Sequence, residues 1–60
     1  MHTSIPRDPA ILLSFLNLKL RDYYADLDTL CDDLELDKHT LEETLQSIDY
    51  TYDPAVNQFI

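Results

Sequence analysis

The sequence predicts a mainly α-helical fold in which three helices precede a small β-hairpin, and three observations support this. In three segments apolar residues recur at helical spacing, and an aspartate that can cap a helix precedes each segment. Residues 50–60 instead contain β-prone side chains on both sides of an Asp-Pro turn signal. The chain contains no glycine, so turns with positive φ fall to Asn or Asp, and helices joined by short loops are favoured.

The first helix is predicted over residues 9–24. Asp8 is a good N-cap, and Pro9 occupies the first helical position, where a missing N–H costs no hydrogen bond. A narrow polar stripe along this helix contains Ala10, Ser14, Asn17 and Arg21. Apolar residues fill an arc of roughly 200° or more, about twice what a surface helix buries. We therefore expect this helix either to lie at the centre of the fold or to contact a second partner.

Two shorter helices are predicted over residues 27–34 and 38–48. Asp26 is placed to cap the first of them, and the apolar face of that helix contains Leu27, Leu30, Cys31 and Leu34. Asp37 is placed to cap the second, and its buried stripe contains Leu41, Leu45 and Ile48. The break at Glu35 and Leu36 separates the two patterns, so a turn is expected there.

The C-terminal segment is predicted to form a short two-stranded hairpin, with strands at about residues 49–53 and 57–60. Both segments are β-prone, and the Asp-Pro pair between them favours a turn. Asn57 tolerates the left-handed backbone conformation that a hairpin loop requires.

Residues 27–48 have the layout of a helix-turn-helix. Cys31 is a small residue in the middle of a helix, where two helices must approach closely, and the apolar turn residue Leu36 follows it. The helix before this pair and the hairpin after it complete a winged-helix-like order. Because a fold does not determine a function, this layout alone does not predict DNA binding.

The length of 60 residues predicts a single domain over residues 1–60. A chain this short buries only about 60% of the surface that its unfolded form exposes. Small domains therefore depend on disulfides, a metal, oligomerisation or dense leucine packing. Cys31 is the one cysteine, which excludes an internal disulfide. Leucine packing and oligomerisation are therefore the expected sources of stability, since no metal site is predicted either.

The formal net charge is −8, from 4 basic and 12 acidic residues. Nucleic-acid binding depends on cations that neutralise phosphates, so this balance argues against DNA, RNA and anionic membranes as partners. It favours a basic partner, or a partner whose binding does not depend on charge. If the helix predicted over residues 38–48 read DNA bases, its exposed face would carry one permanent positive charge, Lys38, and two glutamates. The residues of this face are Lys38, His39, Thr40, Glu42, Glu43 and Gln46.

The apolar stretch of residues 10–18 is not predicted to be a signal peptide or a membrane span. Asp8 precedes it, Ser14 and Asn17 interrupt it, and no A-x-A cleavage site follows it. It is also too short to cross a bilayer. We therefore predict a cytoplasmic protein.

No arrangement of residues predicts catalysis, a cofactor or a metal, so we predict that the protein is not an enzyme. Cys31 has the periodicity of a core residue, which argues against a catalytic pair with His39. His2 and His39 lie far apart in the sequence and neither has a ligand spacing to Cys31. An acidic run lacks the glycine and terminal glutamate of an EF-hand, and is interpreted as a solvated face: Asp26, Asp28, Asp32, Asp33 and Asp37.

The predicted function is a protein-interaction module, working as a homodimer or an adaptor. The apolar arc of the first helix exceeds what the rest of so small a fold is expected to cover, and uncovered apolar patches mark interfaces. Its flank predicts an interaction surface at Ile11, Phe15 and Leu18. Ile60 is expected to add a second contact, because the open edge of a terminal strand can pair with another chain.

Several stretches resemble a family of short bacterial proteins that is catalogued only as a domain of unknown function. They include the N-x-K-L-R-D motif at residues 17–22 and the N-Q-F motif at residues 57–59, together with Pro6-Arg7-Asp8-Pro9, Leu30-Cys31, Ile48-Asp49-Tyr50 and Tyr52. The resemblance covers nearly the whole sequence. It implies a complete, bacterial, cytoplasmic protein, but no activity and no binding residues.

An alternative hypothesis is a regulator linked to nucleic acid. It takes two forms: weak DNA binding by the helix-turn-helix, or an acidic decoy that occupies a basic DNA-binding protein. The net charge of −8 favours the decoy and opposes direct binding.

Overall fold

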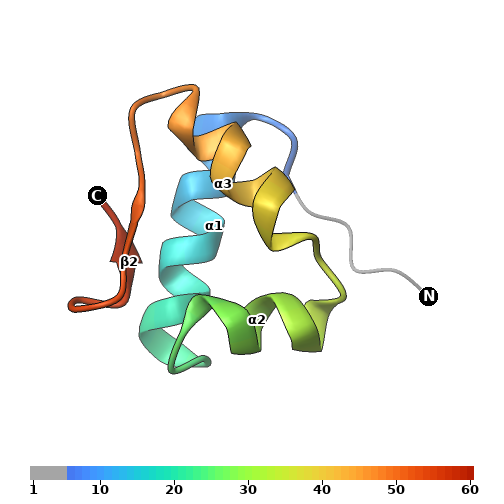
Figure 1. Ribbon diagram of the computed structural model, residues 1–60, viewed down its shortest axis with the longest axis vertical. Coiled ribbons are helices and arrows are strands. Elements are labelled where there is room, and N and C mark those ends of the chain that lie inside the picture. Colours follow the sequence, from blue (N-terminus) through green and yellow to red (C-terminus); the bar gives the residue numbers. More distant parts are fainter. Residues whose placement is uncertain (1–5) are drawn as a thin grey trace.

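The computed structural model describes residues 6–60 and contains three helices followed by an antiparallel hairpin (Figure 1). The prediction of a mainly α fold with a small β-hairpin is confirmed, and the element order is winged-helix-like. The helices are α1 (Pro9–Asp22), α2 (Leu27–Leu34) and α3 (Lys38–Gln46), and the strands are β1 (Tyr52–Asp53) and β2 (Gln58–Phe59).

Aspartates begin all three helices, as predicted. The side chains of Asp8, Asp26 and Asp37 each accept a hydrogen bond from a backbone N–H in the first turn, at 2.9, 2.7 and 3.2 Å respectively. These N–H groups have no hydrogen-bond acceptor within the helix, and the carboxylate next to the helix start provides one. The helix starts therefore follow from local chemistry.

Two helices end earlier than predicted. α1 ends at Asp22 rather than near residue 24, and α3 ends at Gln46 rather than near residue 48. The N–H of Tyr24 bonds to the carbonyl five residues before it, and the N–H of Tyr50 does the same, each at 3.0 Å. A hydrogen bond from an N–H to the carbonyl five residues before it is typical of the C-terminal end of a helix. The apolar pattern continues past both ends because the residues that follow also pack against the core.

Within residues 6–60, three residues have positive φ: Glu35 at 57°, Asp49 at 66° and Asn57 at 53°. The expectation that these positions fall to Asn or Asp holds for two of them. Glu35 is the exception, and it ends α2. The strain of a left-handed residue costs roughly 1–2 kcal/mol. The N–H of Leu36 bonds to a carbonyl in the last turn of α2 at 2.8 Å, which helps to offset this cost.

The hairpin is shorter than predicted, since each strand contains two residues instead of the expected segments 49–53 and 57–60. Asp49 has a positive φ, which turns the chain away from α3, so the first strand begins only after this residue. Asn57 adopts the left-handed conformation in the turn, as predicted.

α1 lies at the centre of the fold and contacts α2, α3 and β2 (Figure 1). Of the two alternatives expected for this helix, the structure shows the central position. Its buried positions are Leu12, Leu16 and Leu20, spaced four residues apart. The buried core comprises these three together with Leu27, Leu30, Cys31, Leu41, Leu45 and Phe59.

Two asparagine side chains join the hairpin to α1. The amide of Asn17 donates to the carbonyl of Phe59 at 3.2 Å, and its oxygen accepts from the N–H of Phe59 at 2.8 Å. The amide of Asn57 donates to the carbonyls of Leu20 and Tyr24 at the end of α1, each at 3.0 Å. The sequence placed Asn17 on a polar stripe, but it did not indicate that this stripe faces β2.

Replacement of Asn17 by alanine is expected to lower the free energy of unfolding by about 2 kcal/mol, because it leaves two half-buried backbone groups without partners. Ser14→Ala is a matched control, since Ser14 occupies the same stripe and is exposed. The control should change the free energy by less than about 0.5 kcal/mol. Urea denaturation followed by far-UV circular dichroism measures both. Equal effects of the two variants would contradict the assigned role of Asn17.

Candidate functional site

The described residues contain little reactive chemistry. Among residues 6–60, no three His, Cys, Asp or Glu side chains lie together so that they could hold a metal ion. Cys31 is buried in the core, and burial raises the pKa of its thiol, so the thiol stays protonated and unreactive at neutral pH. His39 is exposed on α3, with its Nε2 3.5 Å from a carboxylate oxygen of Glu43. His2 lies outside the described residues.

Most of the acidic run between residues 26 and 37 has individual structural partners. Asp26 and Asp37 cap helices, and the hydrogen bonds that they accept hold the pKa of each below its ordinary value. Asp28 pairs with the ammonium of Lys38 at 2.8 Å, and this hydrogen bond raises the pKa of Lys38. Asp33 accepts a hydrogen bond from a tyrosine hydroxyl at 2.5 Å. Exposed pairs of this kind contribute less than about 1 kcal/mol each.

The outward face of α1 leaves part of the predicted interaction surface exposed. Ile11 is 58% exposed and Leu18 is 45% exposed, while Ile60 next to β2 is 52% exposed. Phe15 lies on the same stripe but is half-buried and packs against the core, with the ammonium of Lys19 5.6 Å from its ring centroid. The free apolar surface is therefore smaller than the sequence predicted.

The prediction that the terminal strand has an open edge is wrong. β2 lies between β1 and α1, and the backbone groups of Phe59 on the α1 side are hydrogen bonded to the side chain of Asn17. A further strand cannot pair there unless these bonds break. Ile60 consequently offers an apolar side chain, and not a backbone edge, to a partner.

A shallow depression of about 370 Å³ lies on the surface where α1 meets β2, and its lining residues are Leu13, Ser14, Asn17, Leu18, Arg21 and Gln58. Ile60 projects from the same side of β2 as Gln58, because alternate residues of a strand share a face. We refer to Ile11, Leu18, Ile60 and this depression as the α1 surface. Arg21 at its rim binds the neighbouring Asp22 through two hydrogen bonds, at 3.0 and 3.1 Å.

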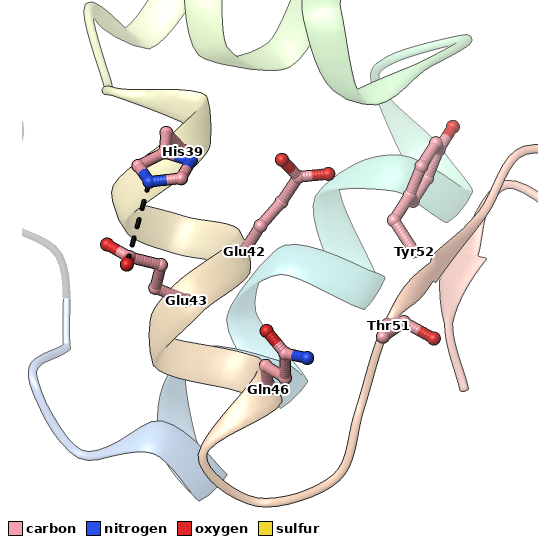
Figure 2. A pocket seen from close by; sticks show the side chains of 6 residues that line it. All are labelled: His39, Glu42, Glu43, Gln46, Thr51 and Tyr52. Carbon is pink, nitrogen blue, oxygen red and sulfur yellow. Dashed lines mark ion pairs between the residues drawn. The ribbon is translucent and has the colours of Figure 1, made fainter.

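A second depression, of about 280 Å³, lies between α3 and β1 (Figure 2). We call it the α3 groove, and its lining residues are His39, Glu42, Glu43, Gln46, Thr51 and Tyr52. Figure 2 shows the first four side chains on α3, and opposite them Thr51 just before β1 and Tyr52 in it. The sequence identified the exposed face of α3 but missed Thr51 and Tyr52, since no local pattern indicates which helix faces this strand.

The charge of the protein is unevenly distributed along the chain. Residues 26–60 contain ten of the 12 acidic residues and only Lys38 among the 4 basic residues. The other basic residues are Arg7, Lys19 and Arg21, which lie in or just before α1. The α1 surface is therefore close to neutral, whereas the α3 groove lies in a strongly negative part of the molecule.

The exposed face of α3 does not have the charge of a DNA-reading helix. Its one firm cation, Lys38, pairs with Asp28, and Glu42 and Glu43 are exposed. Carboxylates in these positions are repelled by phosphates. Separately, none of the helices within residues 6–60 is both long enough and apolar enough to cross a membrane.

A family model described as "Domain of unknown function (DUF4250)" matches residues 6–59. No curated protein and no solved structure matches the chain. The matched range includes all three helices and both strands. It also includes Asn17, Asn57 and Phe59, which form the hydrogen bonds between the hairpin and α1. A structural role accounts for these three residues without a ligand.

Proposed function

The chain belongs to the DUF4250 family, whose function is unknown, and we propose that it is a non-catalytic protein-interaction module that forms a homodimer through the α1 surface. One observation carries this proposal: Ile11 and Leu18 are 58% and 45% exposed although they belong to the central helix of the fold. Exposed apolar side chains that gather on one face mark protein interfaces.

The distribution of charge supports a second copy of the chain as the partner. Two copies that meet at their α1 surfaces bring together nearly neutral parts of the molecule, since neither the lining of the depression nor Ile11 and Ile60 contributes an acidic side chain. Burial of Ile11, Leu18 and Ile60 in both copies then adds to a core that is small for an independent domain. An adaptor that binds a different protein through the same surface would remain monomeric on its own.

Sedimentation equilibrium of the full chain, from about 1 µM to about 1 mM, tests the proposal. We expect a monomer–dimer equilibrium that Leu18→Glu weakens at least about tenfold, because the variant places a charge at the centre of the interface. The far-UV circular dichroism spectrum should not change, since Leu18 is exposed.

Val56→Glu is the matched control, because Val56 is also exposed (54%) but lies in the hairpin turn. It should dimerise like the unmodified chain. A chain that stays monomeric up to the highest concentration would contradict the homodimer, and so would a Leu18→Glu variant that dimerises as well as the control.

A further inference from the structure

The outer edge of β1 is open, in contrast to that of β2. Thr51 and Ile60 exchange both backbone hydrogen bonds, at 3.0 and 2.9 Å. In an antiparallel ladder the next pair, Tyr52 opposite Phe59, directs its backbone N–H and C=O groups away from the partner strand. On β2 these groups bind Asn17. On β1 the corresponding groups of Tyr52 have no hydrogen-bond partner among residues 6–60.

The α3 groove lies beside this open edge. The ring of Tyr52 lies on the same face of the hairpin as that of Phe59, with 5.5 Å between the ring centroids, and Phe59 is buried against the helices. A strand that pairs with β1 would place every second side chain on this face. Those side chains would enter the space between β1 and α3, where Glu42 and Glu43 contribute to the lining (Figure 2).

The charge of the groove determines which strand fits. Its lining contains two glutamates and neither lysine nor arginine, and its one histidine already lies 3.5 Å from Glu43. Asp53, at the end of β1, adds a further acidic residue. A second copy of this chain would bring acidic residues against acidic residues, so like charges oppose β1–β1 pairing between two copies. Alternating basic side chains would instead face the carboxylates of α3.

We propose that the α3 groove binds an extended basic segment of a partner protein, which pairs with β1 as a third strand. Backbone hydrogen bonds to Tyr52 provide the register, and Glu42 and Glu43 select lysine or arginine at alternate positions. This site uses residues different from those of the α1 surface, so it does not depend on the proposed dimer. Binding at this site would explain how an acidic protein could bind, and so block, a basic segment of another protein.

The first test uses a capped hexapeptide in which lysine alternates with threonine, titrated into the ¹⁵N-labelled full chain at low salt. The amide resonances of Thr51, Tyr52 and the exposed residues of α3 should shift in a saturable manner. A hexapeptide with glutamate in place of lysine should cause no shifts. A lysine peptide with alternate amides N-methylated, which cannot pair with a strand, should bind at least about tenfold more weakly. Equal binding of the methylated peptide, or shifts confined to other residues, would overturn the proposal.

The second test separates the groove from the overall negative charge. The double variant Glu42→Gln with Glu43→Gln should weaken peptide binding about fivefold, because it removes two exposed ion pairs. The control Asp32→Asn with Glu35→Gln removes the same charge from exposed positions at the end of α2, and should change binding less than about twofold. If both pairs weaken binding equally, the peptide recognises only the net charge and the proposed site is wrong.

Discussion

Replacement of Phe59 by alanine is expected to lower the free energy of unfolding by about 3–5 kcal/mol, which is most of the stability of a chain this short. Phe59 is 2% exposed and belongs to the buried core, although it is the second-last residue. Its ring also packs against Tyr52, so its loss opens a cavity between the hairpin and the helices. Urea denaturation at 25 °C, followed by far-UV circular dichroism, measures the change.

Val56→Ala is the matched control for this prediction, because Val56 is 54% exposed, is apolar, and lies in the same hairpin but outside the α1 surface. It should change the free energy of unfolding by less than about 0.5 kcal/mol. A Phe59→Ala variant as stable as this control would show that the hairpin contributes little to the core, contrary to the observed packing.

Replacement of Asn57 by alanine is expected to cost about 2–4 kcal/mol, for two reasons that add. The side chain of Asn57 donates to the carbonyls of Leu20 and Tyr24, and accepts a hydrogen bond from the hydroxyl of Tyr52 at 2.6 Å. In addition, its φ of 53° is strained for a residue with a Cβ atom. Thermal and urea denaturation both measure the loss.

Asn57→Gly separates the two reasons. Glycine adopts the positive φ without strain but cannot form the three hydrogen bonds. We expect Asn57→Gly to be destabilised by about 2 kcal/mol, with Asn57→Ala about 1 kcal/mol less stable again. A glycine variant as stable as the unmodified chain would show that these hydrogen bonds contribute nothing.

Both proposed surfaces depend on the position of the hairpin. Ile60 follows β2, and β1 forms one wall of the α3 groove. Asn17 and Asn57 hold the hairpin against α1, so these two side chains determine where both surfaces lie. The motifs that carry the family resemblance therefore contain residues of both kinds: Asn57 positions the hairpin, whereas Leu18 and Tyr52 belong to the candidate surfaces.

The sequence alone predicted the elements that depend on neighbouring residues. The caps at Asp8, Asp26 and Asp37 were identified correctly, because a cap acts on N–H groups within three residues of itself. The width of the apolar arc of α1 led to the expectation of an uncovered flank, and two of its three residues, Ile11 and Leu18, are exposed. The turn at Asn57 was predicted because few residue types tolerate positive φ.

Tertiary structure alone decided the features that join distant parts of the chain. Asn17 and Phe59 are 42 residues apart, and no local pattern indicates that the amide of one completes the backbone hydrogen bonds of the other. The same holds for the α3 groove, whose walls are a helix and a strand with no shared periodicity. Hydrogen bonding and packing across such separations depend on how the whole chain folds, and they determine which edge is closed, which is open, and which apolar residues remain exposed.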